Sequence, residues 1–261
     1  MTVLFEGKEN TPILEFDPIR SAIIEPQGIE VKGGMPEIGI FCFFYDVLED
    51  LQKQNVIKKI GAFRSEMGEQ PLFELVHNGD RFFVLHPGVG APLAVGFLDE
   101  MIANGGKKFV AAGGCGVINE ALPVGMPVIL TEAVRDEGTS YHYLPPSRTV
   151  ESSPLILKAI QSACENQGLS YHLGKSWTTD AIYRETIAKT EMRLKEGCDV
   201  VEMEAAAFFA VAQFREVDFG QIVYGGDLVI PNGYDERDWN KRVNDRERLF
   251  WLAVEACHQL V

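Results

Sequence analysis

Two acidic residues stand at the start of an apolar segment. Glu202 and Glu204, separated by Met203, precede the run Ala205–Phe214, in which no residue is charged. A helix that is apolar all round is expected to be buried, and a buried carboxylate is costly unless something hydrogen-bonds it. If residues 199–203 are extended and the helix begins near Glu204, both acids can face one cleft. There they could accept hydrogen bonds from paired hydroxyls, such as those of a ribose; the alternative is that they cap the helix.

Two further loops carry groups that could bind a ligand or react. Gly88 and Gly90 follow the apolar run Arg81–His86, and glycine turns of this kind let backbone N–H groups approach an anion. A dinucleotide-binding interpretation of this loop is weak, because Leu93 stands where a third glycine is needed. Asp227 follows two glycines at the end of another apolar run. It is either presented into a cleft or forms part of a plain turn.

The elements that must position these residues alternate along the chain. Strands are expected at 81–86, 107–112, 127–131, 169–174 and 220–224, and helices at 93–103, 153–166, 182–196, 204–215 and 238–259. This alternation predicts an α/β fold with a mostly parallel sheet, in which ligands bind at the carboxyl ends of strands. The apolar run Ile38–Val47 is expected in the core, with a subunit interface as the alternative. No linker or repeat interrupts the sequence, so one domain, 1–261, is expected.

Composition excludes several classes of protein. The 24 basic and 38 acidic residues give a net charge of −14, which is unfavourable for binding nucleic acid or an anionic membrane. The five cysteines are scattered, so neither a disulfide framework nor a zinc site is expected. No signal peptide or membrane span is visible. These features predict a cytoplasmic protein that binds a small molecule and has no metal and no organic cofactor.

The segment Val201–Ala206 (VEMEAA) looks like the nucleoside-binding signature of the purine nucleoside and uridine phosphorylase superfamily. Other segments resemble further motifs of that family, in the family's order. They are His86–Pro92 (HPGVGAP), Phe109–Ile118 (FVAAGGCGVI), Thr131–His142 (TEAVRDEGTSYH), Trp177–Tyr183 (WTTDAIY) and Gly226-Asp227. Together they extend over most of the chain.

The resemblance implies both a fold and a reaction. The implied fold is a single three-layer α/β domain around a central mixed, barrel-like sheet, assembled into a homo-oligomer with sites near the subunit interfaces. The implied reaction is cleavage of the N-ribosidic bond of a nucleoside. Phosphorolysis is expected, with inorganic phosphate as co-substrate and free base and ribose 1-phosphate as products. A hydrolytic nucleosidase is the alternative, and a non-catalytic nucleoside-binding or storage protein on the same fold is a further one.

The resemblance also assigns roles to residues. Glu204 matches the acid that binds the ribose, and Asp227 matches the acid that assists the base at purine N7, for which its pKa must be raised. The other ribose- and base-binding positions that it implies are Glu202, Met203, Ile182, Tyr183 and Gly114. Asp227 favours a purine, although the sequence leaves the base open.

The phosphate site departs from the family pattern. Ala111 and Gly114 stand where phosphorylases of this family usually place Arg and Ser or Thr, and the arginine loop expected near residue 25 contains no Arg. The residues left as phosphate-binding candidates are Gly88, Gly90, Arg64 and Arg135. Nucleosidases also lack the strand-end arginine, so the acceptor, phosphate or water, stays open.

Overall fold

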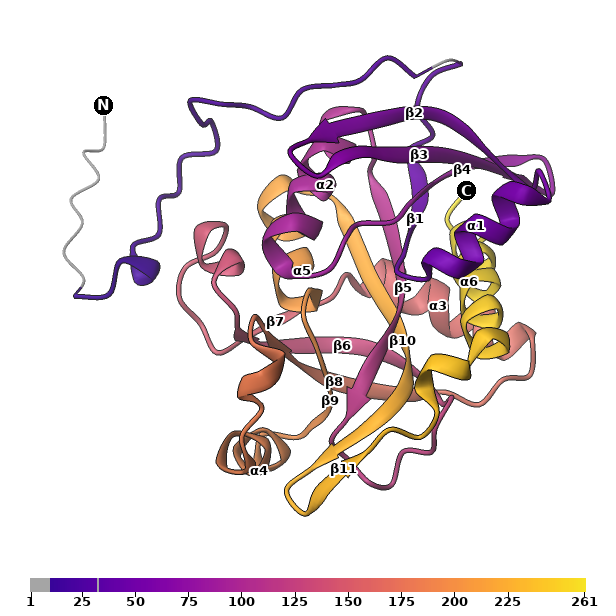
Figure 1. The fold of residues 1–261 in the computed structure, drawn as a ribbon. Helices are drawn as coiled ribbons and strands as arrows, with labels where there is room; N and C mark the ends of the chain where they lie inside the picture. The colour runs from indigo at the N-terminus through magenta and orange to yellow at the C-terminus, as the bar shows by residue number, and fades with distance from the viewer. Residues whose placement is uncertain (1–9, 32) are drawn as a thin grey trace.

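A mixed sheet of eleven strands runs through the protein (Figure 1). The computed structural model describes residues 10–31 and 33–261. The strands are β1 (Ile38–Cys42), β2 (Ile57–Ser65), β3 (Gly68–His77), β4 (Asp80–Leu85), β5 (Lys108–Val117), β6 (Pro127–Asp136), β7 (Thr149–Glu151), β8 (His172–Thr179), β9 (Cys198–Glu202), β10 (Asp218–Ile230) and β11 (Gly233–Asp235).

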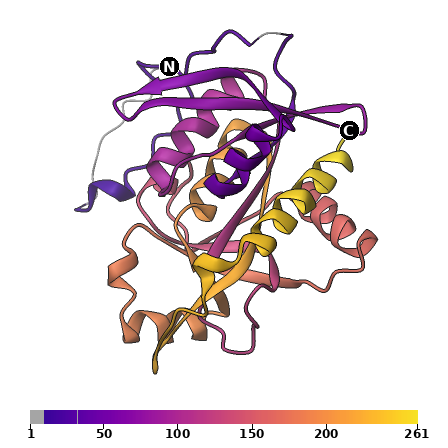
Figure 2. The ribbon, with the colours of Figure 1, turned by 45° about the vertical axis from the view of Figure 1, so that its right-hand side comes forward.

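Helices cover both faces of this sheet. The α-helices are α1 (Tyr45–Lys53), α2 (Ala91–Ala103), α3 (Pro154–Asn166), α4 (Ile187–Lys195), α5 (Ala205–Arg215) and α6 (Val243–His258). Short 3-10 helices are η1 (Pro12–Leu14), η2 (Thr139–His142), η3 (Ile182–Arg184) and η4 (Trp239–Lys241). Helices α2 and α5 lie on one side of the central strands and α1, α3 and α6 on the other (Figures 1 and 2). The three-layer α/β fold with a mixed sheet is therefore confirmed.

The strand order places β5 at the centre of the sheet. Strands β5, β10, β6, β8 and β9 pair in a closed ring, and the strands β1, β4, β3 and β2 extend in that order from β5. The pairs β1–β5, β1–β4, β5–β10, β6–β8 and β8–β9 are parallel, so several carboxyl ends point the same way. The expected parallel relation of β4 and β5 is confirmed, with β1 inserted between them.

Aromatic packing fixes helix α5 against the sheet. Phe208 stacks on Phe219 of β10 with ring centroids 4.4 Å apart, and Phe41 of β1 meets both rings edge-on. Residues Ala205–Val211 of α5 are all at most 1% exposed, as expected for a helix without a polar face. Residues Gly39–Cys42 of β1 are also buried, so this part of the run Ile38–Val47 lies in the core as expected, whereas Tyr45 in the same run is 69% exposed.

Several boundaries differ from those expected from the sequence. Strand β5 continues past Ala112 to Val117, because β10 keeps pairing along it and β9 joins at Gly116. The helix expected at 182–196 is divided into η3 and α4, and Thr186 caps α4 by accepting a hydrogen bond from the Lys189 N–H. The hairpin β2–β3 and helix α1 were not expected.

All five cysteines are buried and unpaired. None of the helices within residues 10–31 and 33–261 combines the length and apolarity needed to cross a bilayer. In the same residues, no group of three or more His, Cys, Asp or Glu side chains is arranged to hold a metal ion.

Candidate active site

The sheet opens at the middle of β5. Along one edge of this strand, β1 pairs as far as Ala112, and the next partner, β9, joins only at Gly116. Between these points, residues 113–115 have no partner on that edge among the described strands, while β10 pairs along the whole opposite edge. The carboxyl ends of β1 and β9 both point toward this gap. Gly114 is exposed although it lies in a central strand and its neighbours Gly113 and Cys115 are buried, so an opening in the sheet reaches the surface at Gly114.

A glycine loop reaches this opening from the end of β4. Gly88 and Gly90 have positive φ angles of 76° and 94°, which non-glycine residues rarely adopt. The Gly90 N–H donates a hydrogen bond to Glu204 Oε1 at 2.5 Å. The loop after β4 is thereby joined to the β9–α5 junction, 114 residues farther along the chain. The amino terminus of α2 also faces this carboxyl group, an arrangement that favours negative charge.

Glu202 holds the β9–α5 junction together. Its Oε1 accepts hydrogen bonds from the hydroxyls of Ser176 (2.8 Å) and Thr178 (2.5 Å) on β8. Its Oε2 accepts from the backbone N–H groups of Glu204 (2.7 Å) and Ala205 (2.6 Å). Glu202 therefore caps α5, and with four donors on two oxygens it has little acceptor capacity left for a ligand.

Glu204 occupies the N-cap position of α5 but makes no capping hydrogen bond with its side chain. The residue is 6% exposed, and burial, followed by the charge of Glu202, raises the pKa of its carboxyl group to about 8. Met203, between the two acids, is half-buried. The junction has the extended-then-helical form expected from the sequence, but the capping role falls to Glu202. Glu204 is left to bind a ligand at the opening.

Asp227 reaches the same region from β10. The pairing of β10 with β5 is irregular between Gly225 and Leu228. There, Asp227 Oδ1 lies 3.7 Å from the position that a Cβ on Gly116 would take, and Val201 of β9 lies 2.9 Å from it. Gly116 is thus flanked by Asp227 and by the strand that leads to Glu204. Burial raises the pKa of Asp227, while a hydrogen bond with Tyr234 and the charge of Arg237 oppose this rise.

The segment resembling a base-binding motif brings an unexpected acid to the site. Burial and the nearby charge of Asp227 raise the pKa of Glu185 to about 7. By contrast, Tyr183 is 94% exposed and Ile182 is 53% exposed, so neither packs against the site within one chain. Sequence reasoning missed Glu185 because its position beside Asp227 depends on the fold, and nothing in the local sequence relates the two residues.

His86 is a second residue that sequence reasoning did not single out. Its Nδ1 accepts a hydrogen bond from the Gly88 N–H at 3.0 Å, and burial lowers its pKa. The ring is therefore neutral at pH 7 and carries its proton on Nε2. Phe43 and Tyr45 pack against it, with ring centroids 6.3 and 6.2 Å away. His86 thus joins the glycine loop to the end of β1. The sequence feature that could have identified it is its position as the last residue of the expected strand, directly before the glycine loop.

Arg135 is buried and makes its hydrogen bonds within the protein. Nε donates to the Ser140 hydroxyl, Nη1 to the Pro145 carbonyl and the Ser147 hydroxyl, and Nη2 to the Leu144 carbonyl. Four of its five N–H groups are thus engaged, and its guanidinium stacks on Tyr141. This geometry supports a role in fixing the loop after β6 rather than in holding phosphate.

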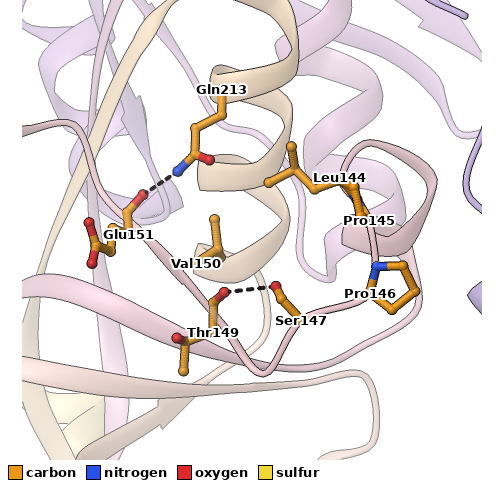
Figure 3. A pocket seen from close by; sticks show the side chains of 8 residues that line it. All are labelled: Leu144, Pro145, Pro146, Ser147, Thr149, Val150, Glu151 and Gln213. Atoms are coloured by element: carbon orange, nitrogen blue, oxygen red, sulfur yellow. Dashed lines mark hydrogen bonds between the residues drawn. The ribbon is translucent and has the colours of Figure 1, made fainter. Parts of the chain in front are cut away.

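The same loop lines an open cavity of about 390 Å³ on the surface (Figure 3). Residues 144–151 form most of its wall, and Gln213 of α5 closes it by donating a hydrogen bond to the Glu151 carbonyl at 2.9 Å. Neither Glu204 nor Asp227 lines this cavity. It is therefore separate from the opening at β5.

Arg64 lies on the edge strand β2, and its side chain is 82% exposed. Within the described chain its guanidinium pairs with Glu69, with Nη2 and Oε2 3.3 Å apart. Binding of phosphate by Arg64, from the same or a neighbouring subunit, stays a prediction.

The residues at the expected phosphate positions offer no polar or charged side chain. Ala111 is fully buried in the core, and Gly114 faces the ring of Tyr224. The first strand of the described sheet is β1, at 38–42, and the loop that follows it is Phe43-Phe44. Residues 24–28 precede the sheet, and the loop after β1 holds no arginine.

Comparison with known proteins agrees with the resemblance seen in the sequence. The sequence model of the phosphorylase superfamily matches residues 37–249. A guanosine phosphorylase of Halorubrum lacusprofundi is 28% identical over 197 residues, which cover 74% of this chain and 82% of that protein. The match to the superfamily model begins at residue 37, next to the first residue of β1.

Solved structures share the fold. The purine nucleoside phosphorylase of Toxoplasma gondii superposes with a TM-score of 0.76 at 21% identity, covering 93% of this chain and 98% of that one. The AMP nucleosidase of Bacteroides thetaiotaomicron superposes with a TM-score of 0.70 at 21% identity, covering 87% and 89%. At these identities the likeness establishes the fold.

Proposed function

The chain belongs to the phosphorylase superfamily, and we propose that it cleaves the N-ribosidic bond of a nucleoside by phosphorolysis. Membership makes it a nucleoside phosphorylase or a closely related N-ribosyl hydrolase. The proposed co-substrate is inorganic phosphate, and the products are free base and ribose 1-phosphate.

The observation that carries this proposal is the state of Glu204. A glutamate that is 6% exposed, with a pKa of about 8 and one carboxyl oxygen held by the Gly90 N–H, is costly to keep without a ligand. Since Glu202 already caps α5, stability of the helix does not require Glu204. Paired hydroxyls of a ribose would supply the donors and acceptors that this carboxyl group lacks. Met203, next to it, would pack beneath the sugar.

Asp227 is proposed to assist departure of the base. During the reaction a phosphate oxygen forms a bond to C1′ while the C1′–N bond breaks, and its electron pair passes to the base. A purine leaves more readily when N7 receives a proton. Because burial raises the pKa of Asp227, its carboxyl group is better able to supply that proton near neutral pH. Glu185, beside it, is proposed to face the base.

A purine nucleoside is the preferred substrate in this proposal. The placement of Asp227 against Gly116 supports it. The guanosine phosphorylase among the relatives favours the same class.

Hydrolysis is the second candidate function. Ala111 and Gly114 present no side chain that could bind an anion, and the AMP nucleosidase structure shows that the fold also occurs in a nucleosidase. In that case water would replace phosphate at the opening.

The active unit is proposed to be a homo-oligomer in the cytoplasm. Exposure of Ile182 and Tyr183 on one chain would be relieved by a neighbouring copy, and Arg64 is free to reach such a copy. The five unpaired cysteines suit a reducing compartment.

Release of free base with and without phosphate tests the proposal. The purified protein is incubated with inosine, adenosine, guanosine and uridine, and free base is measured by chromatography. Phosphorolysis predicts release from a purine nucleoside only when phosphate is present. Equal release without phosphate would establish hydrolysis instead, and binding without release from any of the four would support a storage protein.

A further inference from the structure

Asp227 lies near the base of a hairpin that projects from the end of the sheet (Figures 1 and 2). In this hairpin β10 and β11 pair antiparallel, with Val229 opposite Tyr234. A Cβ on Gly116 would lie 3.3 Å from Val229 Cγ2 and 3.7 Å from Asp227 Oδ1, so Val229 and Asp227 extend from the same face of β10. Side chains of directly opposite residues share a face. Tyr234 is therefore on the face that carries Asp227, as its diagonal neighbour across the hairpin.

The hydroxyl of Tyr234 donates a hydrogen bond to the carboxyl group of Asp227 across this diagonal. Diagonal neighbours have Cβ atoms about 7 Å apart, a separation that a tyrosine side chain can span. The same hydroxyl accepts a hydrogen bond from the indole N–H of Trp239. Although Tyr234 is 64% exposed, its hydroxyl is thus fixed between a donor and an acceptor, and each of the two bonds strengthens the other.

The turn between β11 and η4 brings Trp239 back to β10. Arg237 and Asp238 in this turn have φ angles of 46° and 51°, in the left-handed region that costs non-glycine residues free energy. Arg237 Nη1 donates a hydrogen bond to the Leu122 carbonyl at 3.1 Å, which holds the turn in place. As a result, Trp239 Cβ lies 3.4 Å from the position that a Cβ on Gly226 would take. The turn therefore keeps Trp239 next to the residue that precedes Asp227.

Other titratable groups face Asp227 from the elements around it. They are Glu236 and Arg237 in the turn after β11, Glu185 before α4 and Cys115 of β5. Burial raises the pKa of Asp227, the charge of Arg237 opposes this rise, and the charge of Glu236 adds to it. These charges have no directional preference, whereas the hydrogen bond from Tyr234 also fixes the orientation of the carboxyl group.

We propose that Tyr234 is a positioning residue for Asp227, whose hydroxyl holds one carboxyl oxygen and leaves the other to face N7 of the base. This inference rests on the proposed cleavage of a purine nucleoside, in which Asp227 supplies a proton. As the C1′–N bond breaks, its electron pair passes to the base and the carboxyl proton passes to N7. The carboxylate that remains keeps the hydrogen bond from Tyr234. Because this bond stabilises a carboxylate more than a carboxylic acid, it makes Asp227 a stronger acid.

The pKa of Asp227 in the substrate-free protein tests the contact directly. Carbon-13 NMR of protein labelled at Asp Cγ follows the titration, and the signal of Asp227 is assigned by its absence from Asp227→Asn. In Tyr234→Phe, which keeps the ring, this pKa should rise by about one to two units, because the carboxylate loses a hydrogen bond. Tyr171→Phe is the matched control and should not change it, since the Tyr171 hydroxyl donates to Glu165 of α3. An unchanged pKa in Tyr234→Phe overturns the proposal.

Turnover separates a positioning role from a structural one. Cleavage of guanosine requires a proton at N7, whereas the base of 7-methylguanosine leaves without one. Tyr234→Phe should lower kcat for guanosine roughly 10- to 100-fold and keep the wild-type kcat for 7-methylguanosine. For guanosine, the pH at which kcat falls should move upward, because the protonated carboxyl group of Asp227 then persists to higher pH. Equal losses for both substrates would indicate that Tyr234 only stabilises the hairpin, and would overturn the proposal.

Failure of the proposed function gives different results. If the wild type releases base equally without phosphate, hydrolysis replaces phosphorolysis. The comparison of guanosine with 7-methylguanosine then still tests Tyr234, because the base leaves in both reactions, and selective loss with guanosine would support the positioning role. If the wild type cleaves no nucleoside, the proposed function fails and the positioning role fails with it, whatever the pKa of Asp227.

Discussion

Replacing Glu204 with Gln should separate the stability of the protein from its activity. In the folded protein the pKa of Glu204 is raised from 4.5 to about 8 by burial and by Glu202. A raised pKa means that the wild type loses stability as pH rises from about 4.5 to about 8, because the unfolded chain releases this proton while the folded protein still holds it. Gln stays neutral, so the variant avoids this loss. At about 1.4 kcal/mol per pKa unit, the variant should gain at most about 5 kcal/mol over the wild type above pH 8.

Activity should change in the opposite direction. The Gln amide cannot bind both ribose hydroxyls as the carboxyl group does. The transition state should therefore lose about 2–4 kcal/mol of stabilisation, which lowers kcat/KM roughly 30- to 1,000-fold. Urea unfolding at pH 5, 7 and 9 gives the stability, and base release from inosine or guanosine gives kcat/KM. The stabilities of the two proteins should coincide near pH 5 and diverge toward pH 9. A variant less stable than the wild type at pH 9 would refute the assignment of Glu204 to a ligand.

Three further substitutions have distinct expected outcomes. Glu202→Ala leaves two N–H groups of the α5 cap without a partner, so urea unfolding should show a loss of about 2–4 kcal/mol; unchanged stability would contradict the capping role. Asp227→Asn should lower kcat for purine nucleosides roughly 100- to 10,000-fold, with a much smaller loss for 7-methylguanosine, whose base needs no proton to leave; equal losses for both substrates would exclude proton donation. Arg135→Met removes the donors of one buried and three part-buried hydrogen bonds and should cost about 2–4 kcal/mol of stability. Its phosphate KM should match the wild type, and a raised KM would return Arg135 to the phosphate site.

The fold class and the central acids could be predicted from the sequence because their signals are local. The β9–α5 junction appears as an extended run followed by a helix without a polar face, and both were found within a few residues of their true limits. Strand–helix alternation likewise predicted the α/β fold. In contrast, the continuation of β5 to Val117 depends on pairing with β10, more than a hundred residues away, which no local pattern reveals.

The division of labour between Glu202 and Glu204 could not be predicted, since it depends on which donors surround each carboxyl group. Ser176 and Thr178 lie on β8, and no spacing in the sequence relates them to Glu202. The role of a charged side chain can be assigned only when its partners in the fold are known.

The identity of the sugar product tests the central claim most directly. Phosphorus-31 NMR follows the wild-type protein with inosine or guanosine and inorganic phosphate while free base is measured in parallel. The proposed function predicts a sugar phosphate that accumulates in a one-to-one ratio with the base as inorganic phosphate is consumed. Release of base with constant inorganic phosphate and no sugar phosphate would contradict it.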